Sequence, residues 1–182
     1  PIFLRRLTEL AAPPGGINAG AAGAAGAAGA AGAAGAGAAP PFVAVYYSFI
    51  AHWPYPDYGE TTHVLKPVRP LNNYYNNLRY LDQQIERVYD YLKQKNLLDS
   101  TIVVFAGDHG EAFGRNNQRG HGGNLYEENI HVPLFFIQPR LFDGAQKDDL
   151  GGLVDVAPTI MHLIGQPAPA EWQGSSLLAS GQ

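Results

Sequence analysis

The chain has 182 residues, a formal net charge of -4 and no cysteine. This length suits one compact domain with a sizeable core. The absence of cysteine excludes a disulfide framework, a zinc–thiolate site and a cysteine nucleophile within these residues. The mildly acidic balance argues against nucleic acid as a partner, because a phosphate-tracking surface needs clustered lysine and arginine.

The first 40 residues carry no candidate chemistry. Residues 3–12 have leucines three apart and predict a short helix, which the two prolines that follow would end. We interpret residues 1–14 as the end of an N-terminal part that precedes this chain. Residues 15–40 consist almost entirely of Gly and Ala. They are typical of a low-complexity flexible linker, and the alternative is that they stand in for a segment of unestablished identity.

From residue 41 onward, strand and helix patterns alternate. Residues 42–50 form a nearly continuous apolar run that predicts a buried strand. Residues 52–70 are rich in Pro, Tyr and Gly and predict a long loop. Apolar residues at 78, 81, 85, 88 and 92 recur with helical spacing, which predicts an amphipathic helix over residues 72–96.

The second half continues this alternation. Residues 101–106 and 132–137 predict two more strands, separated by a glycine-rich loop. Asp155 is in position to cap a helix that runs to Ile164, with Gly165 closing it. This order predicts an α/β fold in which a parallel sheet lies between helices on both faces. We therefore treat residues 41–182 as one structural region.

Asp108 and His109 directly follow an apolar strand. In open α/β sheets ligands gather beyond the carboxyl ends of the strands, and a carboxylate beside an imidazole can bind a divalent metal. Gly107 and Gly110 would let the backbone turn tightly and approach an anion closely. The alternative is an ordinary turn, in which the Asp and His side chains only cap backbone groups.

Two further histidines occupy similar loops. His121 is flanked by glycines, so it is sterically open and can donate a hydrogen bond to an oxyanion or protonate a leaving group. A solvent-exposed loop histidine is the alternative. His52 follows the first predicted strand. If the strands are parallel, the three loops that carry these side chains meet at one edge of the sheet.

Several motifs together resemble a known family. They are PPFVAVYYSFIAHWPY, FAGDHGEAFG, GHGGNLYEENIHVPLFF and LVDVAPTIMHLIG, which begin at residues 40, 105, 120 and 153. Their order and spacing resemble the C-terminal half of the sulfatase family catalytic domain, within the alkaline-phosphatase-like superfamily. The resemblance implies that residues 41–182 form this half of the domain. Two features depart from the family. His131 stands where many sulfatases have arginine, and a lysine expected before the Tyr-Glu pair is not evident.

The resemblance implies roles for four residues. Members of the family cleave or transfer sulfate, phosphate or phosphonate esters with a metal-bound nucleophile. By motif, Asp108 and His109 match ligands of one divalent ion, which would be calcium, manganese or zinc. His121 matches the catalytic histidine that contacts the ester or its leaving group, and His52 matches a substrate-binding histidine.

The resemblance also implies a function for the larger protein. We expect a metal-dependent hydrolase of sulfate esters whose nucleophile lies outside this chain, since no Cys-x-Pro-x-Arg segment is present. A transferase of phosphoethanolamine or glycerophosphate groups and a non-catalytic binding subunit are the alternatives. The expected partner is a sulfate or phosphate ester. We expect a periplasmic, extracytoplasmic or membrane-anchored location, with any anchor in the N-terminal part.

Overall fold

The computed structural model describes residues 41–144, 146, 148 and 150–179. The helix expected at residues 3–12 and the Gly/Ala segment lie outside these residues. The chain divides into two compact units between Asn96 and Leu97, and each is described by itself. None of the helices in the described part is long and apolar enough to cross a membrane.

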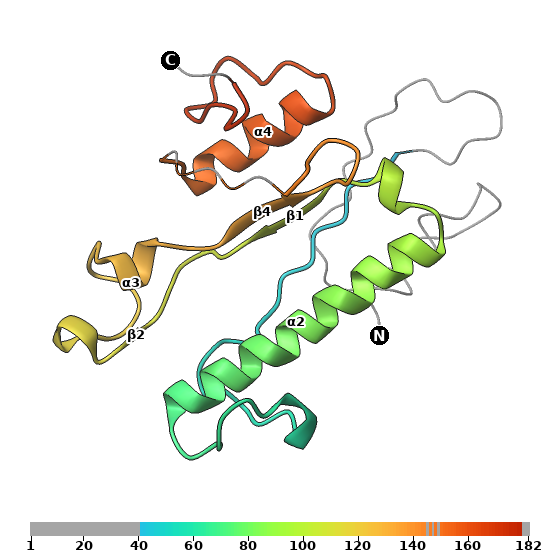
Figure 1. Ribbon diagram of the computed structural model, residues 1–182. Helices are drawn as coiled ribbons and strands as arrows, with labels where there is room; N and C mark the ends of the chain where they lie inside the picture. The colour runs from blue at the N-terminus through green and yellow to red at the C-terminus, as the bar shows by residue number, and fades with distance from the viewer. Residues whose placement is uncertain (1–40, 145, 147, 149, 180–182) are drawn as a thin grey trace, which may run out of the picture. The chain divides into compact units, whose positions relative to one another are not determined.

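The first unit is built on one long helix, α2, which spans Pro70–Gln94 (Figure 1). Pro70 stands in the first turn, where its missing N–H costs no hydrogen bond. The predicted helix is thus confirmed, with an N-terminus two residues earlier than expected. Along its apolar positions Leu92 is buried, Ile85 is half-buried and Leu78 is exposed.

The loop before α2 is folded against the N-terminal half of the helix. It contains a short 3-10 helix, η1, over Glu60–Thr62. Asn76 of α2 fixes the end of the loop, because its side-chain oxygen accepts the N–H groups of Val64 and Leu65, both at 2.9 Å. Its side-chain nitrogen donates to the Leu65 carbonyl at 2.8 Å. The loop is therefore held to the helix by a nearly buried amide.

The strand predicted over residues 42–50 is absent from the described structure, so that prediction is wrong here. The segment forms no sheet ladder, and its large side chains are exposed, with Tyr47 at 62% and Phe49 at 64%. The physical reason is that a strand needs a neighbouring backbone to take up its N–H and C=O groups. The described residues of the first unit contain no other strand.

The second unit contains two strands at the predicted places, β1 (Val103–Ala106) and β4 (Leu134–Ile137). They pair antiparallel, with Val103 opposite Ile137 and Ala106 opposite Leu134. The parallel arrangement expected for these strands is therefore wrong. The chain leaves β1 at Ala106 and enters β4 at Leu134, directly opposite, so the two strands run in opposite directions. A parallel pair would need a connection that crosses back to the start of β1.

The segment between β1 and β4 carries the smaller elements. β2 (Ala112–Phe113) pairs antiparallel with β3 (Arg119–Gly120). A short 3-10 helix, η3 (Arg115–Asn117), and one short helix, α3 (Glu127–Ile130), complete this segment, while another 3-10 helix, η2 (Leu98–Ser100), precedes β1. The loop with Asp108 and His109 emerges from the end of β1, in the sheet formed by β1 and β4.

The C-terminal part forms α4 (Val156–Leu163), preceded by η4 (Leu153–Asp155). As predicted, the helix ends at Gly165, whose φ of +69° suits glycine. Asp155 stands at the N-cap position, but its carboxylate does not cap α4. It instead accepts the N–H of Gly152 and the N–H of Ser175, both at 2.8 Å. Thr159, fully buried, accepts the N–H of Leu177 at 3.0 Å.

Candidate active site

The loop after β1 is locked against the segment that leads into β4 by its backbone. Gly107 N–H donates to the Pro133 carbonyl at 3.0 Å, and Gly110 N–H donates to the Asn129 carbonyl at 2.8 Å. A Cβ atom on Gly110 would overlap the Glu128 carbonyl oxygen. We expected these glycines to admit an anion. In the structure both glycines instead lie close to other parts of the chain, Gly107 to the side chains of Val132 and Pro133 and Gly110 to the backbone of Glu128.

Asp108 and His109 lie between these two locked positions. The His109 N–H donates to the Asp108 Oδ1 at 3.0 Å, and the His109 Nδ1 lies 2.9 Å from the Gly110 carbonyl oxygen. Because a carbonyl can only accept, Nδ1 carries the hydrogen in this bond and Nε2 keeps its lone pair. That Nε2 lies 3.8 Å from the Asp108 Oδ2. The backbone therefore directs one imidazole lone pair and one carboxylate oxygen to the same region.

His121 lies in the same place, although it is 12 residues further along the chain. Its ring stacks on the ring of His109, with centroids 3.7 Å apart and an interplanar angle of 24°. Its Nδ1 lies 3.4 Å from the Glu111 Oε2, which is longer than a typical hydrogen bond. The structure thus brings together Asp108, His109 and His121, the three site residues that we predicted in this unit.

Glu111 is a site residue that we did not predict. Its side chain is only 10% exposed and faces His121. The signal was present in the sequence, because Glu111 ends the Asp-His-Gly-Glu run at the strand end. A nearly buried carboxylate beside an imidazole helps to orient the ring.

The residues present fit a divalent metal ion in part. Asp108 and His109 offer one oxygen and one nitrogen, a donor pair that calcium, manganese or zinc can use to different degrees. Metal–ligand distances of about 2.0–2.6 Å allow two atoms 3.8 Å apart to bind one ion. Within the described ranges no group of three or more His, Asp or Glu side chains is arranged to hold a metal by itself. Asp108 and His109 therefore supply a partial ligand set.

His52 belongs to the first unit. Its Nδ1 lies 2.7 Å from the Trp53 carbonyl oxygen, and its ring meets the edge of Phe49 at a centroid distance of 5.6 Å. Its ring is therefore fixed by local contacts. The predicted meeting of three loops at one edge stays a prediction for His52.

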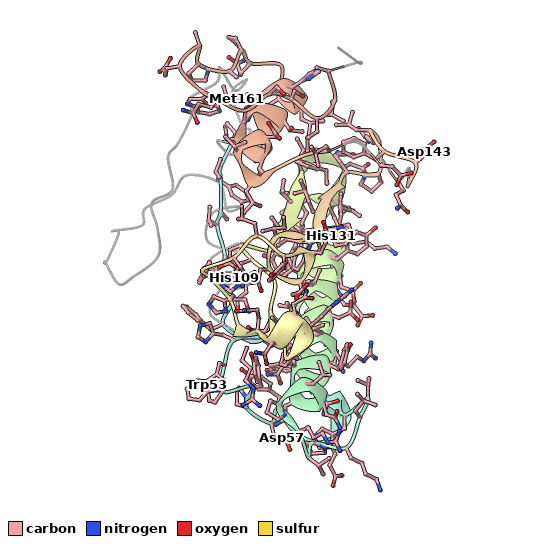
Figure 2. All side chains as sticks on the ribbon, turned by 90° about the vertical axis from the view of Figure 1, so that its left-hand side faces the viewer. Trp53, Asp57, His109, His131, Asp143 and Met161 are labelled. Carbon is pink, nitrogen blue, oxygen red and sulfur yellow. The ribbon has the colours of Figure 1, made fainter. Side chains whose placement is uncertain are left out.

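His131 directly follows α3 as its C-cap residue. Its Nδ1 is 3.4 Å from the Glu127 Oε2, and both side chains are about four-fifths exposed, at 81% and 78%. Figure 2 labels His109 and His131. An exposed, solvent-screened pair of this kind contributes little to stability.

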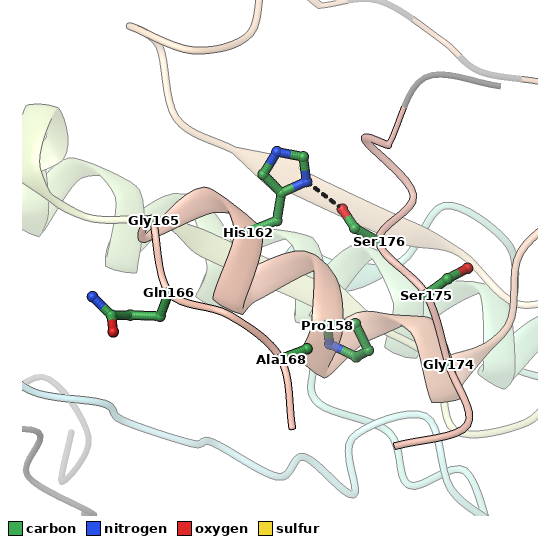
Figure 3. A pocket seen from close by; sticks show the side chains of 8 residues that line it. All are labelled: Pro158, His162, Gly165, Gln166, Ala168, Gly174, Ser175 and Ser176. Carbon is green, nitrogen blue, oxygen red and sulfur yellow. Dashed lines mark hydrogen bonds between the residues drawn. The ribbon is translucent and has the colours of Figure 1, made fainter. Parts of the chain in front are cut away.

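A cavity of about 360 Å³ lies beside α4 and the C-terminal tail, and sequence reasoning did not anticipate it (Figure 3). The His162 Nδ1 and the Ser176 Oγ on its wall are 2.8 Å apart. The same hydroxyl accepts the N–H of Leu178 at 3.2 Å. The Ser176 hydroxyl thus ties the tail to α4, and the cavity contains none of the predicted site residues.

Comparison with known proteins agrees with the motifs. The sulfatase family model matches residues 30–166. The chain is 33% identical over 105 residues to human arylsulfatase K, covering 58% of this chain and 19% of that protein. It is 29% identical over 136 residues to an extracellular sulfatase SULF-1 homolog of Drosophila melanogaster, covering 70% of this chain and 12% of the relative.

One relative is named as a synthase and not as a sulfatase. Lipoteichoic acid synthase 2 of Bacillus subtilis is 36% identical over 104 residues, covering 52% of this chain and 16% of the synthase. The chain thus spans about a fifth or less of the length of these curated relatives.

A solved structure shares the fold of this part. It is a protein in complex with its substrate D-glucosamine-2-N,6-O-disulfate, and it matches with a TM-score of 0.55 and 29% identity. The match covers 59% of this chain and 22% of that protein. The described fold is therefore a portion of the alkaline-phosphatase-like architecture that sulfatases share. Because the family model spans most of its residues, this chain belongs to the sulfatase family.

Proposed function

We propose that this chain forms part of a metal-dependent hydrolase of sulfate esters. One observation carries the proposal. The side chains of Asp108, His109 and His121 gather at the end of β1, in a chain that belongs to the sulfatase family. An acidic ligand, an imidazole ligand and a proton donor within one loop region are the groups that ester cleavage needs.

In this proposal Asp108 and His109 hold the ion. The Gly110 carbonyl holds the His109 Nδ1–H, so the Nε2 lone pair points toward Asp108. Such a bond from the outer ring nitrogen fixes the tautomer and the orientation of a metal-ligating histidine. When bound, the divalent ion supplies positive charge that offsets the ester oxygens and makes the nucleophile more acidic.

His121 is cast as the proton donor to the leaving oxygen. Glu111 stands 3.4 Å from its Nδ1, which leaves the Nε2 side of the ring to give a proton to the departing alcohol. The stacked His109 ring sets the plane of His121.

His52 is proposed to contact the substrate. Its ring is fixed by the Trp53 carbonyl and by the edge of Phe49. A histidine held by local contacts can present its other nitrogen to a sulfate oxygen or a hydroxyl without losing much side-chain freedom on binding. We also propose that the protein works outside the cytoplasm, since one relative is named as an extracellular sulfatase.

The second candidate is transfer of a phospho-alcohol group, such as phosphoethanolamine or glycerophosphate. The 36% identity to a lipoteichoic acid synthase favours it. The nucleophile separates the two candidates, because a threonine favours transfer and a cysteine or serine favours sulfate hydrolysis.

The test uses the full-length protein that contains this chain. Purified protein should hold close to one divalent ion per molecule and should release sulfate from an aryl sulfate. Asp108→Ala should lose both the ion and the turnover. A variant that keeps its full metal content and full sulfate release would contradict the assigned ligand role. Transfer from a phospholipid without sulfate release would favour the second candidate.

A further inference from the structure

His121 lies between two stretches of chain that are held in different ways. On its N-terminal side the β2–β3 ladder pairs Gly120 with Ala112. On its C-terminal side come Gly122 and Gly123, with φ values of +92° and +77°, and a Cβ atom at either would meet nothing within 4 Å. Within the described part of the chain, residues 122–125 take part in no hydrogen bond between two backbone groups. The backbone alone therefore does not fix the C-terminal side of His121.

Asn124 is the residue that anchors this side. Its side-chain Oδ1 accepts the Asn129 Nδ2–H at 2.7 Å and the Tyr126 backbone N–H at 3.2 Å. Its Nδ2 donates to the Gln118 Oε1 at 3.3 Å. Because the Tyr126 N–H can only donate, the atom that faces it is the amide oxygen, which fixes the orientation of the Asn124 side chain. The Asn124 amide thus joins the residue before β3 to α3.

Asn129 connects this anchor with the loop after β1. Asn129 is only 5% exposed, and its backbone carbonyl accepts the Gly110 N–H at 2.8 Å. Its side chain donates to Asn124. One residue of α3 therefore holds the loop with His109 through its backbone and the loop with His121 through its side chain. The two imidazole rings that stack with centroids 3.7 Å apart are also linked by this second route.

We infer that Asn124 is a positioning residue for His121. The inference rests on the proposed function, in which His121 gives a proton to the leaving oxygen. A general acid works only within hydrogen-bond reach of the atom that it protonates, and a displacement of about 1 Å can lower a rate about a hundredfold. The two glycines after His121 impose little conformational restriction of their own. The Asn124 amide supplies the fixed point that keeps the imidazole against His109.

The hydrogen bonds separate this role from general support of the site. The loop with Asp108 and His109 is held by the N–H groups of Gly107 and Gly110, which donate to backbone carbonyls. Neither bond involves the Asn124 side chain. Loss of the Asn124 amide should therefore leave the proposed metal ligands in place and affect the position of His121.

The experiment compares Asn124→Ala with wild type in the full-length protein loaded with its metal. The measurements are kcat and KM over a series of sulfate esters whose leaving groups have graded pKa values. Asn124→Ala should lower kcat by up to about a hundredfold for esters of weakly acidic alcohols and much less for esters of acidic phenols. KM and the metal content, measured by elemental analysis, should stay at wild-type values.

Three further variants sharpen the comparison. Asn124→Asp keeps the oxygen that accepts both hydrogen bonds, so it should retain kcat within about threefold. Asn129→Ala removes the donor from the other side but keeps the backbone carbonyl that holds Gly110. It should reproduce the Asn124→Ala pattern, and it serves as the test if Asn124→Ala does not fold. Asn72→Ala, which removes an exposed amide from the first unit, is the control and should change nothing.

A double variant tests whether Asn124 acts through His121. If it does, Asn124→Ala should cost nothing further in a protein that already carries His121→Ala. Additive losses would mean that Asn124 supports the site in another way, and they would overturn the inference. An equal loss of kcat across all leaving groups, or loss of the metal from Asn124→Ala, would overturn it as well.

A measurement without turnover separates this inference from the proposed function. Modification of His121 by diethyl pyrocarbonate, followed by mass spectrometry, reports how firmly the imidazole is held. It should be severalfold faster in Asn124→Ala, whereas His131, whose side chain is 81% exposed, should react equally in both proteins. If wild type releases sulfate from no ester, the proposed function fails, but faster His121 modification would still support the positioning. Equal modification rates of His121 would contradict it.

Discussion

Two loops with site histidines are held in place by different means. The loop after β1 is fixed mainly by backbone hydrogen bonds and by a glycine that leaves no room for a side chain, Gly110. The loop that carries His52 is fixed mainly by side chains, through buried Tyr55, the Asp57–His63 pair and the Asn76 amide. Both place an imidazole in a defined position.

The difference predicts which changes each loop tolerates. Backbone contacts do not depend on the identity of most side chains, and they do not titrate. Side-chain contacts can be removed one at a time, and a carboxylate–imidazole pair changes with pH. We therefore expect the loop after β1 to be disrupted strongly by substitution of a few glycines, and the loop with His52 to be weakened in small steps.

The largest effect is expected from Asp108→Asn. The substitution keeps the shape of the side chain but removes the negative charge of the carboxylate that we propose as a metal ligand. Turnover should therefore fall about a thousandfold or more. Metal content, measured by elemental analysis of the purified full-length protein, should fall in parallel. Asp82→Asn, on the exposed face of α2, is the control and should change neither value.

His121→Ala should have the next largest effect, and it should depend on the substrate. A lost proton donor costs about a hundredfold or more for esters of weakly acidic alcohols and much less for esters of acidic phenols. The measurement is kcat/KM over a series of sulfate esters with leaving groups of graded pKa. An equal loss of kcat/KM across the series would contradict the role of His121 as proton donor. His131→Ala, with its 81% exposed side chain, should leave the series unchanged.

Gly110→Ala tests the backbone lock directly. The added Cβ would overlap the Glu128 carbonyl, so we expect a loss of about 3 kcal/mol in the free energy of unfolding of this region. The measurement is the thermal unfolding midpoint together with metal affinity. Gly152→Ala is the matched control, because its Cβ would meet only ordinary contacts at 3.8 Å. Equal midpoints for the two variants would show that the loop can shift without cost.

Asp57→Asn tests the side-chain loop and should have the smallest effect. The hydrogen bond with His63, and then that from the Gly59 N–H, lower the pKa of Asp57 from its usual 3.8. A lowered folded-state pKa stabilises the loop above the unfolded value, and this stabilisation is lost as pH falls through the folded one. The Gly59 amide should therefore exchange its hydrogen slightly faster in Asp57→Asn than in wild type at pH 6, as measured by hydrogen exchange. The difference should vanish when both proteins are measured below the lowered pKa. A difference that persists there would argue against the carboxylate as its source.

The sequence predicted local elements well where local residues decide them. The helical spacing that ends in Leu92 and the glycine at 165 both appear as expected in α2 and α4. The gathering of Asp108, His109 and His121 was also predictable, since the strand end and the glycine-flanked histidine were visible as motifs. These features depend on residues close to one another in the chain or on a strand end that gathers loops.

Pairing direction and strand formation were not predictable in the same way. An apolar run such as residues 42–50 becomes a strand only beside another backbone, and the run itself does not say which one. Likewise, the residues of β1 and β4 do not record whether the chain between them returns at the same end. Glu111 was visible at the end of the Asp-His-Gly-Glu run, but its closeness to His121 depends on how the intervening loop folds, which spacing alone does not give.

The attachment of the C-terminal tail has a consequence for sequence variation. Asp155 grips the tail at position 175 through the peptide N–H alone. Every amino acid except proline has this N–H, because the ring nitrogen of proline carries no hydrogen. Substitution of Ser175 by any residue other than proline should therefore keep this hydrogen bond. Sequence variation at position 175 should therefore leave the C-terminal tail bonded to the start of α4.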